Sequence, residues 1–286
     1  MYAAKASSTN TRVSHRSGVL FSIMIKKKGA RLGQHFLTAH WAAVMLAREA
    51  GIRPDDTVVE IGPGKGALTG ELLKLSHKVL AIEKDTQLIQ TLHETLASDI
   101  ATGSLRVLDR DIRDFDPARE DLTSGSYVVA ANIPYYITGE IIRQFLSCTT
   151  PPHSMTLLIQ KEVAQRIVAQ DRKESILSIS VKAYGTPRIV AKVGKGCFNP
   201  PPSVDSAIIG ISAISKDFFA NISEEAFFRV VRAGFASKRK YLANNLAVLY
   251  EKEAVKKALE ALALSDKVRA EDIGISQWKA LTQTLE

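Results

Sequence analysis

An asparagine, a proline and two tyrosines directly follow an apolar run, in the segment Asn132-Ile133-Pro134-Tyr135-Tyr136. The Asn132 carboxamide oxygen and a main-chain carbonyl near Pro134 could accept both hydrogens of a planar amine, such as the exocyclic amine of adenine. Holding the amine in this way favours a pyramidal nitrogen, whose lone pair can attack an electrophilic methyl group. Such positioning can contribute about 7–11 kcal/mol in favourable cases. Taken alone, such a segment is more often an Asx-Pro turn that ends a strand.

Tyr135 adds an aromatic ring beside this amide. The ring could stack on the target base, because every base offers a π-face. It could also face the transferred methyl group as positive charge moves onto the amine, which contributes about 1–2 kcal/mol. Methyl transfer to a neutral amine requires no general base beforehand, so this chemistry does not depend on a histidine.

A glycine-rich turn follows an earlier apolar run, in the segment Glu60-Ile61-Gly62-Pro63-Gly64-Lys65-Gly66. Glycines between a strand and a helix let a nucleotide ligand contact the main chain at the carboxyl end of the strand. The G-x-G-x-G spacing differs from the dinucleotide pattern, and Lys65 lacks the following Ser or Thr of a P-loop. Glu83 ends the next expected strand, where a carboxylate can accept two ribose hydroxyls. Asp111 follows the third expected strand, where its carboxylate can accept a hydrogen bond from an adenine amine. A lone Asp at such a position is more often a cap or turn residue.

Short β-branched runs alternate with helical patterns from residue 57 onward, which predicts βαβ units and a doubly wound parallel sheet. The expected elements are Thr57–Ile61, Ala67–Leu75, Lys78–Ile82, Thr86–Ala97, Leu105–Leu108, Tyr127–Ala131, Gly139–Leu146, Met155–Gln160 and Lys161–Ala169. Strands without intervening helices then predict an antiparallel edge, over Leu177–Tyr184, Arg188–Val193 and Ser206–Ser212. An amphipathic helix over Ala39–Ala50 is expected to precede the sheet.

The pattern changes after about residue 215, where only helical spacing remains. Helices are expected over Glu224–Phe235, Tyr241–Tyr250, Glu253–Ala263 and Gln277–Leu285. Ser223, followed by two glutamates, is typical of an N-cap with acids in the first helical turn. The chain is therefore expected to have a flexible basic arm over 1–25, an α/β domain over 26–215 and a small C-terminal α-helical domain over 216–286.

The basic residues are concentrated towards the N-terminus of a chain with 38 Lys and Arg against 30 Asp and Glu, and Glu49 is the first acidic residue. Basic arms usually contact phosphate and add salt-sensitive affinity, although a solvated tail is the simpler interpretation of residues 1–23. An acid-free N-terminus also occurs in transit peptides.

Apolar runs such as Met155–Ile159 are far shorter than the ~20 residues of a membrane span. Two cysteines without metal-type spacing predict neither a disulfide framework nor a metal site, as in a reducing cytosol.

Four segments, in this order and at these separations, together resemble the ribosomal RNA adenine N6-dimethyltransferase family: Leu32–Leu37, Glu60–Gly66, Asn132–Tyr135 and Phe198–Ser206. The similarity runs from about Lys26 to the C-terminus. The segment Gln160–Val163 and the helical C-terminal region favour the branch that acts on the small subunit. The resemblance implies a Rossmann-like class I methyltransferase fold and S-adenosylmethionine as the cofactor. It also implies dimethylation of N6 of two adjacent adenosines in a hairpin loop near the 3′ end of 16S rRNA, with a role in small-subunit biogenesis.

The resemblance further implies roles for single residues. Cofactor contacts are expected from His35, Leu37, Gly62, Gly64, Glu83, Asp111 and Asn132, with His35 standing where the family commonly has an asparagine. Catalytic positioning is expected from Asn132 and Tyr135, with Phe198 on the other face of the flipped adenine. The prolines after Asn199 would make a rigid segment that presents this phenylalanine ring, although a buried loop phenylalanine is the simpler alternative.

Contacts to 16S rRNA are expected from two basic clusters. The first, Lys26, Lys27, Lys28 and Arg31, adjoins the N-terminal motif. The second consists of Lys238, Arg239 and Lys240, with the neighbouring pair Asn244 and Asn245 and, earlier on the preceding helix, Arg229 and Arg232. Runs of surface cations are often only solvated faces, so phosphate contact is a hypothesis for both clusters.

Several other functions stay open on the sequence alone. A drug-resistance methyltransferase acting on large-subunit rRNA would share the catalytic chemistry. A ribosome-assembly factor could bind immature small subunits with only incidental methylation. A DNA adenine methyltransferase fits the motifs poorly, and an organelle transcription-factor relative would require the arm to be a targeting signal. The favoured prediction is a cytoplasmic, monomeric enzyme without a metal ion.

Overall fold

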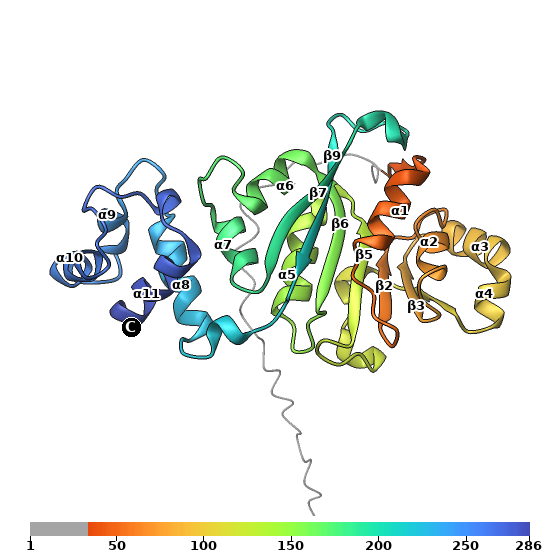
Figure 1. Ribbon diagram of the computed structural model, residues 1–286, viewed down its shortest axis with the longest axis horizontal. Coiled ribbons are helices and arrows are strands. Elements are labelled where there is room, and N and C mark those ends of the chain that lie inside the picture. Colours follow the sequence, from red (N-terminus) through yellow and green to blue (C-terminus); the bar gives the residue numbers. More distant parts are fainter. Residues whose placement is uncertain (1–33) are drawn as a thin grey trace, which may run out of the picture. The chain divides into compact units, whose positions relative to one another are not determined.

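The computed structural model describes residues 34–286 (Figure 1). Outside this part lie the predicted arm over 1–25 and the first basic cluster, Lys26, Lys27, Lys28 and Arg31. Within residues 34–286, no helix is both long and apolar enough to cross a membrane.

Among the described residues, seven strands form one sheet in the order β4-β3-β2-β5-β6-β9-β7. The strands from β4 to β6 in this order are mutually parallel, while β9 is antiparallel to both β6 and β7. The predicted α/β fold with an antiparallel edge is therefore confirmed. The strand bounds are β2 Thr57–Ile61, β3 Val79–Glu83, β4 Leu105–Asp109, β5 Tyr127–Asn132, β6 Ser154–Gln160, β7 Thr186–Val193 and β9 Ser206–Ser212.

A separate two-stranded ribbon joins β1 to β8, and helices connect the strands. The ribbon strands are β1 Phe36–Leu37 and β8 Phe198–Asn199. The helices are α1 His40–Arg48, α2 Thr69–Leu73, α3 Thr86–Thr95, α4 Ala97–Ala101, α5 Thr138–Ser147, α6 Lys161–Val168, α7 Ile176–Lys182, α8 Glu224–Gly234, α9 Leu242–Leu246, α10 Lys252–Ala261 and α11 Ile275–Leu285. Short 3-10 turns cover Ile112–Asp114, Pro117–Glu120, Tyr135–Ile137, Lys195–Cys197, Asp217–Phe219 and Ala270–Asp272.

The central strands are buried on both faces, which explains their nearly continuous apolar sequences. Successive side chains of a strand point to opposite faces, so β2 contributes to two apolar layers. Val59 and Ile61 pack into the layer that contains α5, α6 and α7, while Val58 packs into the layer of α1 and α2. This covering of both faces holds the carboxyl ends of the parallel strands in a fixed relation.

The predicted strand over Leu177–Tyr184 is wrong, because this segment forms α7. The run Ile-Leu-Ser-Ile-Ser-Val matches a strand in its alternation and its β-branched content, but its first turn has a strong helical cap. The Ser175 side chain accepts from the Ser178 N–H at 3.1 Å, and the Ser178 hydroxyl accepts from the Ser175 N–H at 2.7 Å. Such a capping box satisfies two main-chain donors that a helix otherwise leaves unpaired. Local capping therefore outweighs the period-two pattern here.

Figure 1 shows α8, α9, α10 and α11 gathered in one group, drawn in blue. The predicted N-cap of α8 is confirmed, since the Ser223 hydroxyl accepts from the Ala226 N–H. Trp278 of α11 is fully buried at the centre of the group, and its neighbours continue the apolar layer that covers one face of the sheet. The helices over residues 216–286 thus share a core with the α/β part, and the domain boundary near residue 216 stays a prediction.

Candidate active site

The residues that the motifs single out meet at the carboxyl ends of the parallel strands. Asn132 is the last residue of β5, Glu83 is the last residue of β3, and the glycine loop begins directly after β2. The register places Ile61 of β2 beside both Ile82 of β3 and Ala131 of β5. The strand order reverses around β2, and ligands of open α/β sheets bind at such a position, outside the carboxyl ends of the strands.

The glycine loop adopts backbone angles that residues other than glycine reach only with strain. Gly62, Gly64 and Gly66 have φ angles of +65°, +58° and +81°. The Gly64 N–H donates to Glu83 Oε2 at 3.3 Å, while Glu83 Oε1 accepts from the N–H groups of Lys84 and Asp85. These bonds hold the Glu83 carboxylate against the loop, where the other Oε2 lone pair can accept a ribose hydroxyl.

Asp111 lies just beyond β4, in the place that the motif predicts. Its carboxylate caps the 3-10 turn that follows and pairs with Arg113 and with Lys84, the latter at 3.3 Å. The hydrogen bonds from Arg113 hold the pKa of Asp111 far below its ordinary value, although partial burial opposes them. The group is therefore ionised, and an adenine amine would have to share it with Arg113.

Asn132 has a defined amide orientation. Its Nδ2 donates to the His35 main-chain carbonyl at 3.1 Å. A carbonyl oxygen only accepts, so this contact places the NH₂ group towards His35 and turns Oδ1 away from it. Since no hydrogen bond between described residues uses Oδ1, this oxygen is available to accept a hydrogen from a target amine. The Pro134 carbonyl already accepts from the Ile137 N–H at 3.1 Å and keeps one lone pair for a second donor.

Tyr135 is half-buried and held through its hydroxyl, which lies 2.7 Å from the Ser206 hydroxyl at the start of β9. Ser206 is a residue to which the sequence assigned no role, because only the antiparallel edge brings it opposite β6. By contrast, Tyr136 is an exposed side chain. The tyrosine that the motif predicts for stacking is therefore also the one whose ring is fixed.

The ribbon of β1 and β8 brings two distant motifs together. Phe36 is paired with Asn199, and Leu37 with Phe198. The Phe36 ring covers Gly64 so closely that an added Cβ there would lie 3.3 Å from it, and Lys65 Nζ lies 5.0 Å from the ring centroid. The N-terminal motif, the glycine loop and the proline-rich segment thus adjoin one another.

Phe198 does not present its ring to solvent. Its side chain is only 4% exposed and packs in the apolar layer that also contains Leu37, Val193 and Ile208. The expectation that the prolines present this ring is not met in this conformation, and the structure favours the alternative of a buried phenylalanine. Stacking of Phe198 on a target base would require the ring to leave this layer, and its catalytic role stays a prediction.

Glu60 begins the glycine-loop motif, but the sequence analysis assigned no role to its side chain. It is fully buried one residue before the end of β2, and its Oε2 has no hydrogen-bond partner. Burial, opposed by Thr69 and aided by the nearby Glu83 carboxylate, raises the pKa of Glu60 to about 8. The raised pKa favours the protonated form of Glu60 at neutral pH, beside the loop predicted to bind the cofactor. An acidic residue inside an otherwise apolar strand was the signal that could have revealed it.

The second basic cluster lies on the turn between α8 and α9. Lys238, Arg239 and Lys240 are all exposed, and no ion pair between described residues involves them. The neighbours assigned to the same patch differ from this expectation, because Arg229 pairs with Glu286 and Asn245 is buried. Asn245 Nδ2 donates to the carbonyls of Gly234 and Ser237, so its role is structural.

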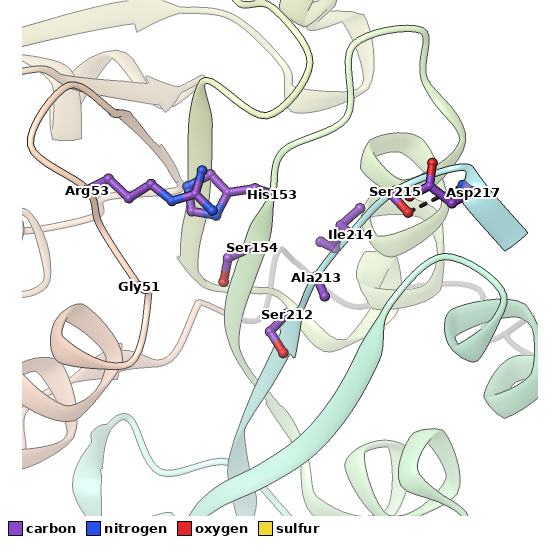
Figure 2. Close-up of a pocket in the computed structure, with 9 residues that line it drawn as sticks. All are labelled: Gly51, Arg53, His153, Ser154, Ser212, Ala213, Ile214, Ser215 and Asp217. Carbon is purple, nitrogen blue, oxygen red and sulfur yellow. Dashed lines mark hydrogen bonds between the residues drawn. The ribbon is translucent and has the colours of Figure 1, made fainter.

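A hollow of about 500 Å³ lies at the opposite end of the parallel strands, and Figure 2 shows the residues that line it. Its lining comes from the start of β6, the end of β9 with the segment that follows it, and the connection after α1: Gly51, Arg53, His153, Ser154, Ser212, Ala213, Ile214, Ser215 and Asp217. None of the predicted site residues is among them. The hollow faces the amino ends of the parallel strands, so we assign the chemistry to the other end, where the motifs converge.

Within the described residues, no cluster of three or more His, Cys, Asp or Glu side chains is arranged to hold a metal ion. The candidate active site is therefore described by main-chain groups, carboxylates, one carboxamide and one fixed tyrosine. Such a set can bind an adenosine-like ligand in the loop after β2 and hold an amine beside Asn132.

Comparisons with known proteins agree with this arrangement. Residues 25–286 match the family described as "Ribosomal RNA adenine dimethylase". The "Ribosomal RNA small subunit methyltransferase A" of Dehalococcoides mccartyi strain CBDB1 is 39% identical over 252 residues, which cover 87% of this chain and 86% of the relative. The protein of the same name from Geobacillus thermodenitrificans is 36% identical over 265 residues, with 89% of each chain covered.

Two solved structures are similar over most of the chain. The crystal structure of the 23S rRNA methyltransferase ErmE has a TM-score of 0.73 and 25% identity, covering 87% of this chain and 99% of that one. A dimethyladenosine transferase from Plasmodium falciparum also has a TM-score of 0.73, with 26% identity over 86% of this chain and 96% of that one. The similarity extends over both the sheet and the C-terminal helices, since it covers more than four-fifths of the chain.

Proposed function

The chain belongs to the ribosomal RNA adenine dimethylase family, and on that premise we propose that it dimethylates N6 of two adjacent adenosines in a hairpin loop near the 3′ end of 16S rRNA. Membership of the family makes it a methyltransferase of ribosomal RNA that uses S-adenosylmethionine. The names of its curated relatives support the small subunit as the target. We also propose that the protein acts as a monomer in the cytoplasm during small-subunit biogenesis.

The observation that carries the proposal is the direction of the Asn132 amide. Its NH₂ group is engaged by the His35 carbonyl, so only Oδ1 can receive a hydrogen from the target. The Pro134 carbonyl provides a second acceptor from the adjacent turn. Two acceptors suit an exocyclic amine with two hydrogens, and they do not suit a hydroxyl or a carbon nucleophile. The two acceptors therefore favour an amine as the target, whatever the sequence of the surrounding RNA.

The residues around the glycine loop fit the cofactor. The three loop residues with positive φ are glycines, which have no side chain of their own at the carboxyl end of β2, and Glu83 is held to accept ribose hydroxyls. Asp111 would contact the adenine amine, and His35 and Leu37 would contact the cofactor from β1. S-adenosylmethionine, when bound, supplies an electrophilic methyl group. The chain's own groups only bind, orient and exclude water, and the amine proton released after transfer passes to solvent.

Recognition of the RNA requires groups outside the catalytic pocket. We propose that the turn Lys238–Lys240 contacts phosphates of the rRNA, because its three exposed cations have no described carboxylate partner. Lys26, Lys27, Lys28 and Arg31, outside the described residues, are proposed to add a second set of phosphate contacts. Adenines in a loop are already unpaired, so stacking on Tyr135 avoids part of the cost of extracting a base from a duplex.

The similarity to ErmE favours one competing function, methylation of large-subunit rRNA. The two structures share the fold over 87% of this chain, and the amine-binding geometry would serve either target. The higher identity to small-subunit methyltransferases, at 39% against 25%, supports the small subunit. An assembly factor with incidental methylation is the other alternative, and the amide orientation of Asn132 argues for a working catalytic site.

Transfer of tritiated methyl groups to purified ribosomal particles tests the proposed function. We expect label on small-subunit particles and N6,N6-dimethyladenosine after nuclease digestion. Replacing Asn132 with Ala should lower the rate at least about 100-fold, because the amine loses its fixed position. Label on large-subunit particles alone, or on a nucleoside other than adenosine, would contradict the proposal. Full methylation by the Asn132→Ala variant would remove the observation on which it stands.

A further inference from the structure

His35 makes a side-chain contact that cofactor binding alone does not require. Its Nδ1 lies 2.8 Å from the main-chain carbonyl oxygen of Pro200. Because a carbonyl only accepts, Nδ1 must carry the hydrogen of this bond. The neutral ring is then held as the Nδ1–H tautomer, since the hydrogen bond of one ring nitrogen decides which nitrogen is protonated.

The same residue adjoins both catalytic side chains. The His35 carbonyl accepts the hydrogen bond that orients the Asn132 amide, at 3.1 Å. The His35 and Tyr135 rings lie with their centroids 6.1 Å apart and their planes at 31°, a separation at which aromatic rings still attract each other. One residue of the N-terminal motif therefore links Asn132, Tyr135 and the segment that follows Phe198.

Few main-chain bonds hold this part of the chain in place. The ribbon of β1 and β8 pairs only two residues on each side. One end of β1 is anchored by Thr38, whose N–H and hydroxyl both donate to the Cys197 carbonyl. At the other end, the described anchor to the proline-rich segment is the His35–Pro200 hydrogen bond. Without this bond the His35 carbonyl would be free to move, and the Asn132 amide would no longer have a fixed partner.

We propose that His35 is a positioning residue for methyl transfer: its ring ties β1 to Pro200 and thereby fixes the carbonyl that sets the direction of the Asn132 amide. The inference rests on the proposed function, because the direction of Asn132 matters only if this amide receives the target amine. It extends the cofactor contact expected of His35 to the alignment of the second substrate.

Two substitutions separate this role from a cofactor contact. His35→Asn places an N–H donor at the position of Nδ1, so the bond to Pro200 can form, whereas His35→Leu fills a similar space without a donor. We expect His35→Leu to lower kcat about 10- to 100-fold at saturating S-adenosylmethionine, because a small misplacement of reacting groups has effects of this size. Loss of a cofactor contact alone would weaken the Kd of S-adenosylmethionine, measured by calorimetry without RNA, but would leave kcat at saturation unchanged. His35→Asn should recover most of the kcat that His35→Leu loses, because it restores the N–H donor to Pro200.

Other results would overturn the inference. An unchanged kcat for His35→Leu would show that the bond to Pro200 aligns nothing. A weakened Kd of S-adenosylmethionine with an unchanged kcat would assign His35 to the cofactor alone. A His35→Asn variant as slow as His35→Leu would exclude the hydrogen bond as the cause.

Nitrogen NMR of the imidazole rings tests the contact in the wild-type protein, even if a variant does not fold. At a pH where the ring is neutral, the His35 signals should show hydrogen on Nδ1 and none on Nε2, and the assignment follows from their disappearance in His35→Asn. The opposite tautomer would contradict the inference. Failure of the wild-type protein to methylate small subunits, with the Nδ1–H tautomer present, would instead count against the proposed function and leave the contact itself established.

Discussion

Glu60 is a titratable group whose burial has a measurable consequence for stability. In the unfolded chain its carboxyl has an ordinary pKa, whereas burial in the folded protein raises the pKa to about 8. Between about pH 4.5 and pH 8 the folded protein therefore holds a proton that the unfolded chain releases. The free energy of unfolding contains a favourable contribution from this proton at low pH, which disappears as the pH rises through this window. The effect is on the order of a few kcal/mol.

We expect Glu60→Gln to remove this pH dependence, because glutamine is neutral at every pH and has a similar shape. The check is chemical denaturation of both proteins between pH 5 and pH 8.5, and the difference in their free energies of unfolding should widen in favour of Glu60→Gln as the pH rises. Glu162→Gln, at an exposed position of α6, is the matched control and should follow the wild-type protein. Parallel curves for the wild-type protein and Glu60→Gln would show that Glu60 is ionised throughout.

At the scale of elements, the close contact of α8 with α11 depends on a glycine. Gly234 is the last residue of α8, and a Cβ added there would lie 2.3 Å from Trp278 Cη2 and 2.9 Å from Leu242 Cδ1. Trp278 is fully buried, so its ring has no open space to move into. The better helix propensity of alanine, worth about 1 kcal/mol, is outweighed by overpacking of about 1–3 kcal/mol or more.

We therefore expect Gly234→Ala to lower the free energy of unfolding and the Tm, measured by denaturant titration and by calorimetry. The matched control is Gly70→Ala in α2, where an added Cβ meets no atom within 4 Å and a small stabilisation is expected. A Gly234→Ala variant as stable as the wild-type protein would mean that α11 shifts away from α8 without cost.

At the scale of the whole molecule, RNA affinity should depend on where the basic residues lie and not only on the net charge. Replacing Lys238, Arg239 and Lys240 with alanine should weaken binding to small-subunit particles. It should also flatten the dependence of log K on log salt, by up to about 0.7–0.9 for each phosphate that the variant no longer neutralises. The control replaces Lys252, Lys256 and Lys257 on α10, which are also exposed, and thus removes an equal charge. Filter binding across a salt series measures both slopes, and equal slopes for the two variants would refute specific contacts at the turn.

Much of the fold could be predicted because its information is local. The apolar β-branched runs predicted five parallel strands close to their observed bounds, and the glycine loop was expected after β2, where it lies. The error at α7 has a local cause too, since alternation over six residues is compatible with a strand and only the capping box decides for a helix. The position of the site followed from the topology, because the carboxyl ends of parallel strands all lie on the same side of the sheet.

The sequence by itself determined which residue types stand at the ends of the strands: the glycines, Glu83, Asp111, Asn132 and Tyr135. Only the tertiary structure decided what these side chains contact. Asn132 is directed by the carbonyl of His35, 97 residues away, and His35 by the carbonyl of Pro200, 165 residues away. The burial of Phe198 and the raised pKa of Glu60 likewise come from residues that are distant in the chain. Orientation, burial and protonation depend on atoms that are distant in the chain, and no local pattern of residues specifies them.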